Sequence, residues 1–156
     1  MSRRNLNQSF EQIAGPLWLV EGIAEVIATD YSQRHRTSYP TVIVLALYAA
    51  TRTDQRELKS LKFEKNASRD YPVAHLAVHL LAMRYGSNSV LDYWRLIGQG
   101  TPKDQAFETL FGMTVTEYET LFKDLRQSTS PLLAFAKGES LPDRALPPQP
   151  RLSISN

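Results

Sequence analysis

The stretch Pro16–Asp30, PLWLVEGIAEVIATD, predicts a long helix around which the rest of the chain packs. Pro16 suits the first helical position, where its missing N–H has no helical partner in any case. Glu21 and Glu25 are four residues apart, so both carboxylates project from one face. Burying such a pair requires a cation, a metal or hydrogen-bond donors. The apolar residues that recur at helical spacing are Trp18, Leu19, Ile23, Val26 and Ile27.

The composition indicates one globular domain without a nucleic-acid or disulfide signature. The chain has 156 residues, of which 42% are hydrophobic and 22% charged, so it is long and apolar enough to bury a core. Its 18 Lys and Arg residues against 16 Asp and Glu residues leave a net charge of only +2, and no nucleic-acid partner is expected. The absence of cysteine excludes disulfides, thiolate catalysis and cysteine-based metal sites.

The longest apolar run is Thr41–Ala50 (TVIVLALYAA), about half of the roughly 20 residues that a transmembrane helix needs. The N-terminus is basic but lacks the apolar segment of a signal peptide. We therefore expect no transmembrane segment and a cytoplasmic location, which includes the cytoplasmic face of a membrane complex. A continuous apolar run fits a buried helix or a buried strand. Its leucines and alanines favour the helix.

Start and stop signals along the rest of the chain predict an all-α fold, a compact domain of five to six helices. Glu57–Phe63 predicts a short amphipathic piece, and the polar segment Glu64–Asp70 predicts a loop. Tyr71–Tyr85 is strongly apolar and predicts a second long helix, which Gly86 closes.

The next helix is predicted from a capping signal. Ser89 is followed by Asp92 three residues later, a variant of the capping box. The helix that it opens would end at Gly98 or Gly100, since glycine commonly follows the last helical residue.

Two further helices follow with clearer signals. Pro102 would occupy the first position of a short helix that Gly112 stops. Thr114 and Glu117 form a full T-x-x-E capping box and predict a helix at Val115–Gln127.

The chain divides into three parts by composition. Residues 1–15 form an N-terminal arm or short helix, residues 16–136 the helical domain, and residues 137–156 a proline-rich tail expected to be extended. Extended proline-rich segments lose little conformational entropy on binding, so we expect a larger protein complex to be contacted by this tail. The tail residues predicted to bind the partner are Leu141, Pro142, Pro147, Pro148 and Pro150.

The segment WLVEG at Trp18–Gly22, followed by Ala24 and Glu25, resembles a signature of gluzincin metallopeptidases. This clan includes the aminopeptidase N-like and the peptidase MA-like proteins. Tyr85-Gly86, the stretch from Gly100 to Ala106-Phe107, and Phe111-Gly112 resemble the helical C-terminal half of peptidase MA-like domains, so the likeness spans residues 16–125. The resemblance implies that Glu21 is the third zinc ligand and that Tyr71 lies near the site.

The chain departs from the gluzincin pattern upstream of Glu21. Gluzincins carry an H-E-x-x-H helix there, whose histidines bind zinc and whose glutamate acts as general base. Residues 1–15 contain no histidine. Without those companions Glu21 specifies no water-activating centre, so no cofactor is expected, and zinc would enter only if the missing half is supplied.

A histidine pair elsewhere is an alternative metal-binding candidate. His75 and His79 in HLAVH have the spacing that lets two imidazoles share one metal, with Glu21 or Glu25 as third ligand. Leu76 stands where the catalytic glutamate would be, so the base chemistry would be absent. Otherwise the histidines lie on a helix stripe that faces a polar seam or a partner.

The two glutamates also have an interpretation without metal. Structural ion pairs are common, and Arg34, Arg36 or Arg84 could pair with Glu21 and Glu25. The sequence therefore predicts a non-catalytic, degenerate gluzincin-like domain, a structural or interaction subunit of a larger assembly. The alternative is a partial or split zinc metallopeptidase whose H-E-x-x-H half is missing or lies on another chain. A third interpretation is a helical adaptor whose likeness to peptidases is coincidental.

Overall fold

The computed structural model describes residues 12–33, 39–141, 144 and 146–147. The named secondary-structure elements among these residues are all helices, so the predicted all-α class is confirmed. Seven α-helices and one 3-10 turn lie wholly within the described part of the chain, more than the five to six expected, because residues 129–137 form a helix of their own; residues 12–14 are helical as well. The elements are α2 (Leu17–Gln33), α3 (Tyr39–Thr51), η1 (Leu58–Ser60), α4 (Phe63–Tyr85), α5 (Ser87–Gly98), α6 (Lys103–Phe111), α7 (Val115–Leu125) and α8 (Thr129–Lys137).

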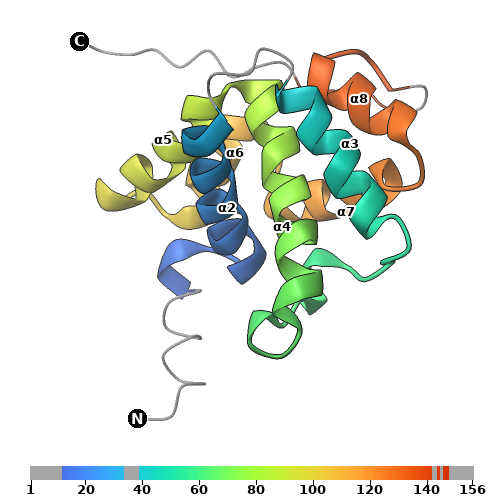
Figure 1. Ribbon diagram of the computed structural model, residues 1–156. Helices are drawn as coiled ribbons and strands as arrows, with labels where there is room; N and C mark the ends of the chain where they lie inside the picture. Colours follow the sequence, from blue (N-terminus) through green and yellow to red (C-terminus); the bar gives the residue numbers. More distant parts are fainter. Residues whose placement is uncertain (1–11, 34–38, 142–143, 145, 148–156) are drawn as a thin grey trace.

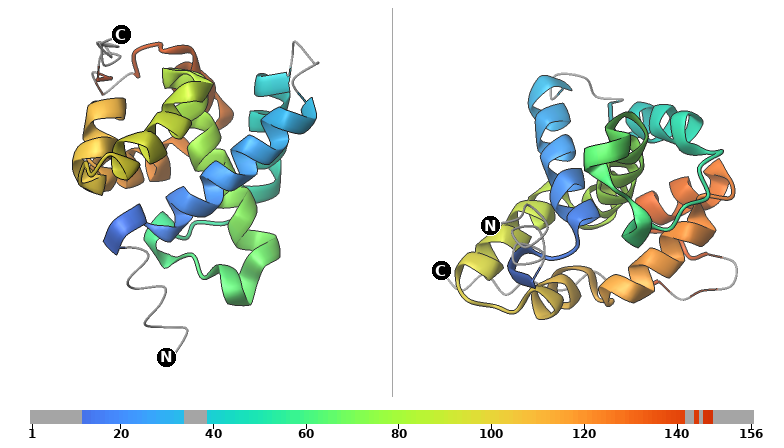
Figure 2. Two further views of the ribbon diagram at one scale, coloured as in Figure 1. Left: turned by 90° about the vertical axis from the view of Figure 1, so that its left-hand side faces the viewer. Right: turned by 90° about the horizontal axis from the view of Figure 1, so that it is seen from below.

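Helix α4 is the centre of the molecule and packs against α2, α3, α5 and α8. Figure 1 shows α2 and α3 on either side of α4. Seen from the side, α2 and α3 form one layer and α5 to α8 the other, with α4 between them (Figure 2). No helix in the described part of the chain has both the length and the apolar character to cross a membrane.

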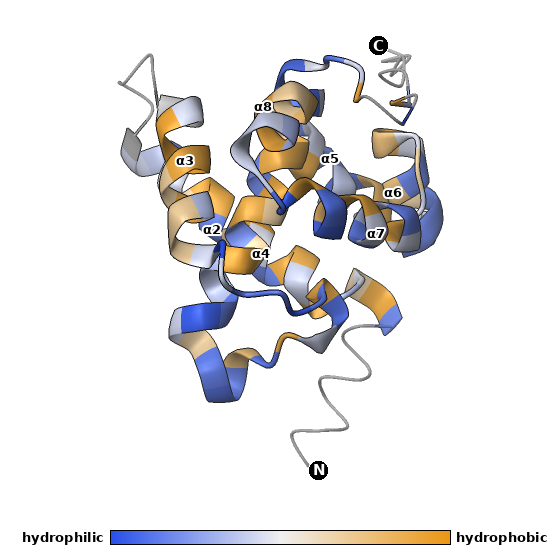
Figure 3. Cartoon of the chain, turned by 90° about the vertical axis from the view of Figure 1, so that its right-hand side faces the viewer, coloured by the Kyte–Doolittle hydropathy of each residue, from blue (hydrophilic) through white to orange (hydrophobic). Residues whose placement is uncertain are grey.

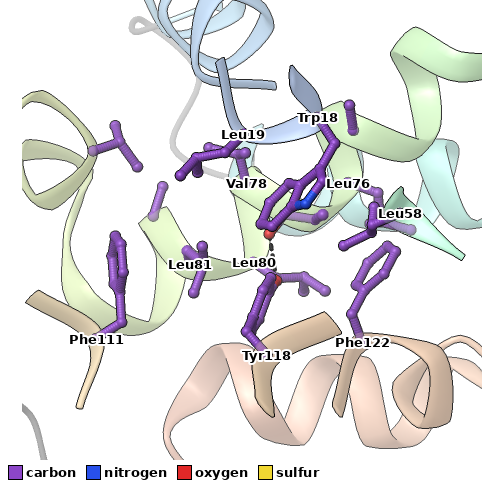
Figure 4. Packing of buried hydrophobic residues seen from close by; sticks show 14 of the residues in the cluster. Trp18, Leu19, Leu58, Leu76, Val78, Leu80, Leu81, Phe111, Tyr118 and Phe122 are labelled. Carbon is purple, nitrogen blue, oxygen red and sulfur yellow. Dashed lines mark hydrogen bonds between the residues drawn. The ribbon is translucent and has the colours of Figure 1, made fainter. Parts of the chain in front are cut away.

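The glycine of WLVEG lets α2 approach α4 closely. A Cβ atom on Gly22 would stand 2.5 Å from the carbonyl oxygen of Ala74 and 2.5 Å from Cγ2 of Val78, closer than real side chains pack. Trp18 and Leu19 are then buried against α4 (Figure 4), and Ile23 and Val26 are buried as well. The segment is a packed helix as predicted, but the prediction that the rest of the chain packs around it is wrong, because α4 holds that central position.

Buried aromatic side chains join the layers through polar ends that find partners. The indole Nε1 of Trp18 donates a hydrogen bond to Oε1 of Glu119 on α7, at 2.8 Å. The hydroxyl of Tyr118 donates to the carbonyl of Ala77 in the middle of α4 (Figure 4). The hydroxyl of Tyr93 donates to the carbonyl of Ala14 at 3.0 Å. The polar ends of buried tyrosine and tryptophan side chains usually find such partners.

The start of α4 corrects the prediction of a loop at Glu64–Asp70. The helix begins at Phe63 and passes through one irregular residue, Asn66, whose φ is −134°. Asp70 is fully buried; it accepts the Lys62 N–H at 2.6 Å and pairs with Arg56 at 2.7 Å. The prediction was wrong because a tertiary ion pair, not local apolar periodicity, stabilises this polar turn.

The predicted boundaries of α5, α6 and α7 are partly correct. Thr114 and Glu117 form the predicted capping box of α7, which ends at Leu125 rather than at Gln127. Helix α5 begins at Ser87, so Ser89 is no cap; its hydroxyl donates instead to the carbonyl of Gly86 at 2.6 Å. Pro102 is the N-cap of α6 and not its first helical residue.

The described part of the tail lies against its own domain. Leu141 and Leu146 pack on the core, and Nη2 of Arg84 donates to the carbonyl of Pro147 at 3.2 Å. Arg144 lies 3.7 Å from Asp124 of α7. Pro142, Pro148 and Pro150, for which the sequence predicts a partner contact, lie outside the described residues, as do residues 1–11 of the predicted N-terminal arm.

Candidate functional site

Helices α2 and α4 bring the two glutamates of the WLVEG helix next to Tyr71. All three side chains are half-buried at the seam between the helices. Burial, the charge of Glu21, a hydrogen bond to Glu21 and the charge of Glu25 together raise the pKa of Tyr71 above its usual value. The tyrosine ring packs edge-on against Phe63, with centroids 5.1 Å apart. The structure therefore brings together at one seam three residues that the sequence singled out.

His75 and His79 continue the same side of α4, one and two turns beyond Tyr71. They are only 7% and 4% exposed, and their rings meet edge to face with centroids 5.8 Å apart. Burial, and then the neighbouring His79, lower the pKa of His75 to about 4. Nε2 of His75 is buried without a hydrogen-bond partner. His75 is therefore a neutral imidazole at ordinary pH.

The predicted three-ligand combination of these histidines with Glu21 or Glu25 is not assembled. Among the residues that the structure describes, no group of three or more His, Asp or Glu side chains is placed to hold a metal ion. What lies together is a carboxylate pair with a tyrosine and, separately, a pair of imidazoles. Neither set by itself provides an activated water or a nucleophile with its base.

The arginines predicted to neutralise the glutamates lie elsewhere or outside the described residues. Arg34 and Arg36 fall in the segment 34–38, which is not described. The guanidinium of Arg84, at the end of α4, stacks over the ring of Tyr85 at 5.6 Å and donates to the carbonyl of Pro147. Within α2 no residue is basic, so the helix presents carboxylates only.

A groove between α2 and the start of α5 is not predicted from the sequence. It has a volume of about 190 Å³. Three exposed apolar side chains line it: Ile27 (42% exposed), Tyr31 (74%) and Leu91 (37%). Asp30 also lines the groove. The prediction that Ile27 belongs to the core stripe is thus wrong. The signal for the groove is a second apolar stripe on α2, at helical spacing: Ala24, Ile27, Ala28 and Tyr31.

A second feature that the sequence did not predict is a polar network between the α3–α4 connection and the end of α7. Arg56 pairs with both Asp54 and Asp70, and these carboxylates raise its pKa. The hydrogen bond from Arg56 lowers the pKa of Asp54. Arg126, which is 4% exposed, donates to the carbonyls of Arg56 at 3.0 Å and Thr51 at 3.3 Å, and burial lowers its pKa. The network joins the α3–α4 connection to the end of α7 and has a structural role.

Two cavities lie between the tail and helix α7. Their volumes are about 370 Å³ and 340 Å³, and Arg144 and Leu121 line both. Leu146 and Pro147 complete the first, and Leu141 the second. The tail therefore forms one wall of each cavity.

Comparison of the chain with known protein families, with curated proteins and with solved structures finds no match.

Proposed function

We propose that this chain is a non-catalytic, degenerate gluzincin-like domain that acts as an interaction subunit of a larger assembly. One observation carries the proposal: the outer face of α2 exposes an apolar stripe beside a groove, in a helix whose opposite side is core. A helix that is apolar on both sides is normally covered on both. The open face therefore favours docking to another protein over a role as a free-standing catalyst.

The charged residues of α2 indicate what kind of surface the partner would have. Glu21, Glu25 and Asp30 are the charged residues of the helix, and none of its residues is basic. A surface that combines apolar side chains with carboxylates is complementary to one that combines apolar side chains with lysine or arginine. The partner is thus expected to present a basic amphipathic element to this groove.

A capture experiment with two matched variants tests the proposal. The tagged full-length chain is used as bait, and Ile27→Glu places a carboxylate in the groove. Thr109→Glu adds the same charge at an exposed position of α6, in the other layer. We expect the partners of the wild-type chain to be retained by Thr109→Glu and lost by Ile27→Glu. Equal capture by all three baits would refute a role for the groove.

The tail is the second predicted contact, and the structure sharpens its test. Removing all of residues 137–156 would also uncover the core beneath Leu141 and Leu146. Ending the chain after Pro147 retains those contacts and removes only the last nine residues, with Pro148 and Pro150. If the tail is the arm that binds the partner, this shorter deletion should weaken capture. Capture that is unchanged by it would leave the groove as the docking surface.

A split zinc metallopeptidase is the alternative, and the position of Glu21 supports it. The carboxylate of Glu21 lies at the seam of α2 and α4 beside Tyr71, half-buried rather than engaged in the core. A second chain that carries H-E-x-x-H could then complete a zinc site. In that case the co-purified complex would contain near-stoichiometric zinc and hydrolyse peptides, and Glu21→Gln would remove both properties. A complex without zinc or hydrolysis supports the non-catalytic proposal.

A further inference from the structure

Two histidines interrupt the buried, apolar middle of helix α4. Every residue from 73 to 82 is buried, and apart from His75 and His79 all of them are apolar. Figure 3 shows this hydrophobic middle of α4 with other helices on both sides. Buried polar atoms normally have a hydrogen-bond partner, yet Nε2 of His75 has none among the described residues. Packing alone therefore does not explain why imidazoles stand in this stretch.

The two imidazoles lie at a separation that suits a shared metal ion. Residues four apart on a helix project from the same face, one above the other. The ring centroids of His75 and His79 are 5.8 Å apart. A metal that binds ring nitrogens at about 2.0–2.1 Å holds the centroids of two imidazoles roughly 4.5–6.5 Å apart, from a right-angled to a linear arrangement. The observed separation falls inside this range, toward its linear end.

The protonation state of His75 also suits a ligand. Metals bind the neutral imidazole, so a protonated histidine must first lose its proton. Burial, and then the neighbouring His79, lower the pKa of His75 to about 4. His75 is therefore already in the metal-binding form at neutral pH.

The surroundings of the pair favour a metal that needs only two neutral ligands. Zinc normally takes four ligands in protein sites. No third His, Asp or Glu is placed beside the pair among the described residues, and exposures of 7% and 4% leave little access for water ligands. Copper(I) forms two-coordinate complexes, and imidazole is one of the ligands that copper accepts. Its single charge also costs less to bury than the double charge of zinc.

We propose that His75 and His79 bind one copper(I) ion between their imidazoles, in the apolar middle of α4. Nε2 of His75 supplies one bond and a ring nitrogen of His79 the other, after small rotations of the rings. The ion enters and leaves as copper(I), so no group of the protein is oxidised or reduced. Because water has little access, the site holds copper and does not activate a water molecule. This activity goes beyond docking to a partner and does not depend on it.

Copper retention by the full-length chain tests the site. The chain is mixed with copper(I), kept reduced by ascorbate in the absence of oxygen, and passed through gel filtration. We expect the wild-type chain to retain one copper(I) ion and His75→Asn to retain none, because an amide oxygen suits harder cations than copper(I). His35→Asn removes the third histidine of the chain, outside the described residues, and should retain copper like the wild type. A wild-type chain without copper, or equal losses in both variants, overturns the proposal.

A measurement on the wild-type chain keeps the test decisive if circular dichroism shows that His75→Asn does not fold. Copper(I) is diamagnetic, so nuclear magnetic resonance can follow the ring nitrogens of all three histidines during its addition. We expect the signals of His75 and His79 to shift together until one equivalent has been added, while those of His35 stay unchanged. Shifts confined to His35, or no shifts at all, overturn the proposal.

A divalent ion is the competing occupant, and zinc serves as its probe. We expect zinc to be lost during gel filtration of the wild-type chain, because the pair offers only two ligands. Zinc that the wild-type chain retains and His75→Asn loses would assign the pair to a divalent ion and overturn the choice of copper(I). None of these measurements includes a partner protein, so the capture experiment with Ile27→Glu stands or falls separately.

Discussion

At the scale of single residues, Gly22 is a position where any larger side chain would meet the backbone of another helix. The backbone of α4 occupies the space that a side chain on this residue would need, because the Ala74 carbonyl oxygen lies 2.5 Å from the place that its Cβ atom would take. A backbone atom cannot move aside without shifting the whole helix. The glycine of the peptidase-like signature therefore has a packing reason of its own.

We expect Gly22→Ala to destabilise the fold by about 1–3 kcal/mol, the usual cost of overpacking, because α2 must move away from α4. Gly98→Ala is the matched control: this glycine is also helical, and nothing lies within 4 Å of the added methyl group. The control should be neutral or slightly stabilising, since alanine is the better helix former. Urea unfolding measures both. A Gly22→Ala protein as stable as the Gly98→Ala protein would contradict the close approach.

The buried imidazole of His75 makes the free energy of unfolding depend on pH. Burial, and then His79, lower its pKa from 6.5 to about 4, so the unfolded chain binds a proton that the folded chain does not. The stabilising contribution is complete above about pH 6.5 and is lost as pH falls toward 4, by an amount on the order of 3 kcal/mol. His75→Asn should therefore flatten the urea-unfolding free energy between pH 7 and pH 4.5. A variant with the same pH slope as the wild type would exclude His75 as its cause.

At the scale of elements, the first turn of α4 depends on a contact distant in the chain. Asp70 accepts the N–H of Lys62 and pairs with Arg56, and it is fully buried. These bonds tie the α3–α4 connection to the helix on the far side of the irregular residue Asn66. The polar sequence of this turn gives no local sign of such a partner.

Asp70→Asn should destabilise the chain by about 2 kcal/mol, because it removes the charge that Arg56 pairs with inside the protein. Amide hydrogen exchange should accelerate first in residues 62–69, the turn that the bond stabilises. Glu57→Gln is the control, since Glu57 contacts Lys59 and Lys123 at the surface, and no measurable change is expected there. Unaltered exchange in Asp70→Asn would mean that the turn is stable without the ion pair.

At the scale of the whole molecule, the described tail belongs to the domain that it follows. Leu141 and Leu146 are half-buried against the core, and Arg84 from the end of α4 bonds to Pro147. The sequence predicts an extended arm from residue 137; Lys137 is still the last residue of α8, and the described residues beyond it run outside any helix. Its role in binding a partner stays a prediction.

Truncation separates the two roles of the tail. A chain that ends at Gly138 should lose about 2 kcal/mol of stability relative to one that ends at Pro147, because two half-buried leucines are removed and the core beneath them is uncovered. Thermal unfolding of the two truncated chains measures the difference. Equal stability would show that the packing of Leu141 and Leu146 contributes nothing to the fold.

The sequence by itself determined the helical class, the packed side of the WLVEG helix, the capping box of α7 and the glycine stops. Each of these follows from residues close together in the chain, through periodicity or a local hydrogen bond. The tertiary structure alone decided that α4 is the central helix, that the histidines lack a third ligand among the described residues, and that α2 and α3 each leave apolar residues exposed. Those outcomes depend on which faces α4 covers. Helix crossing angles and packing set that coverage, and no local pattern encodes them.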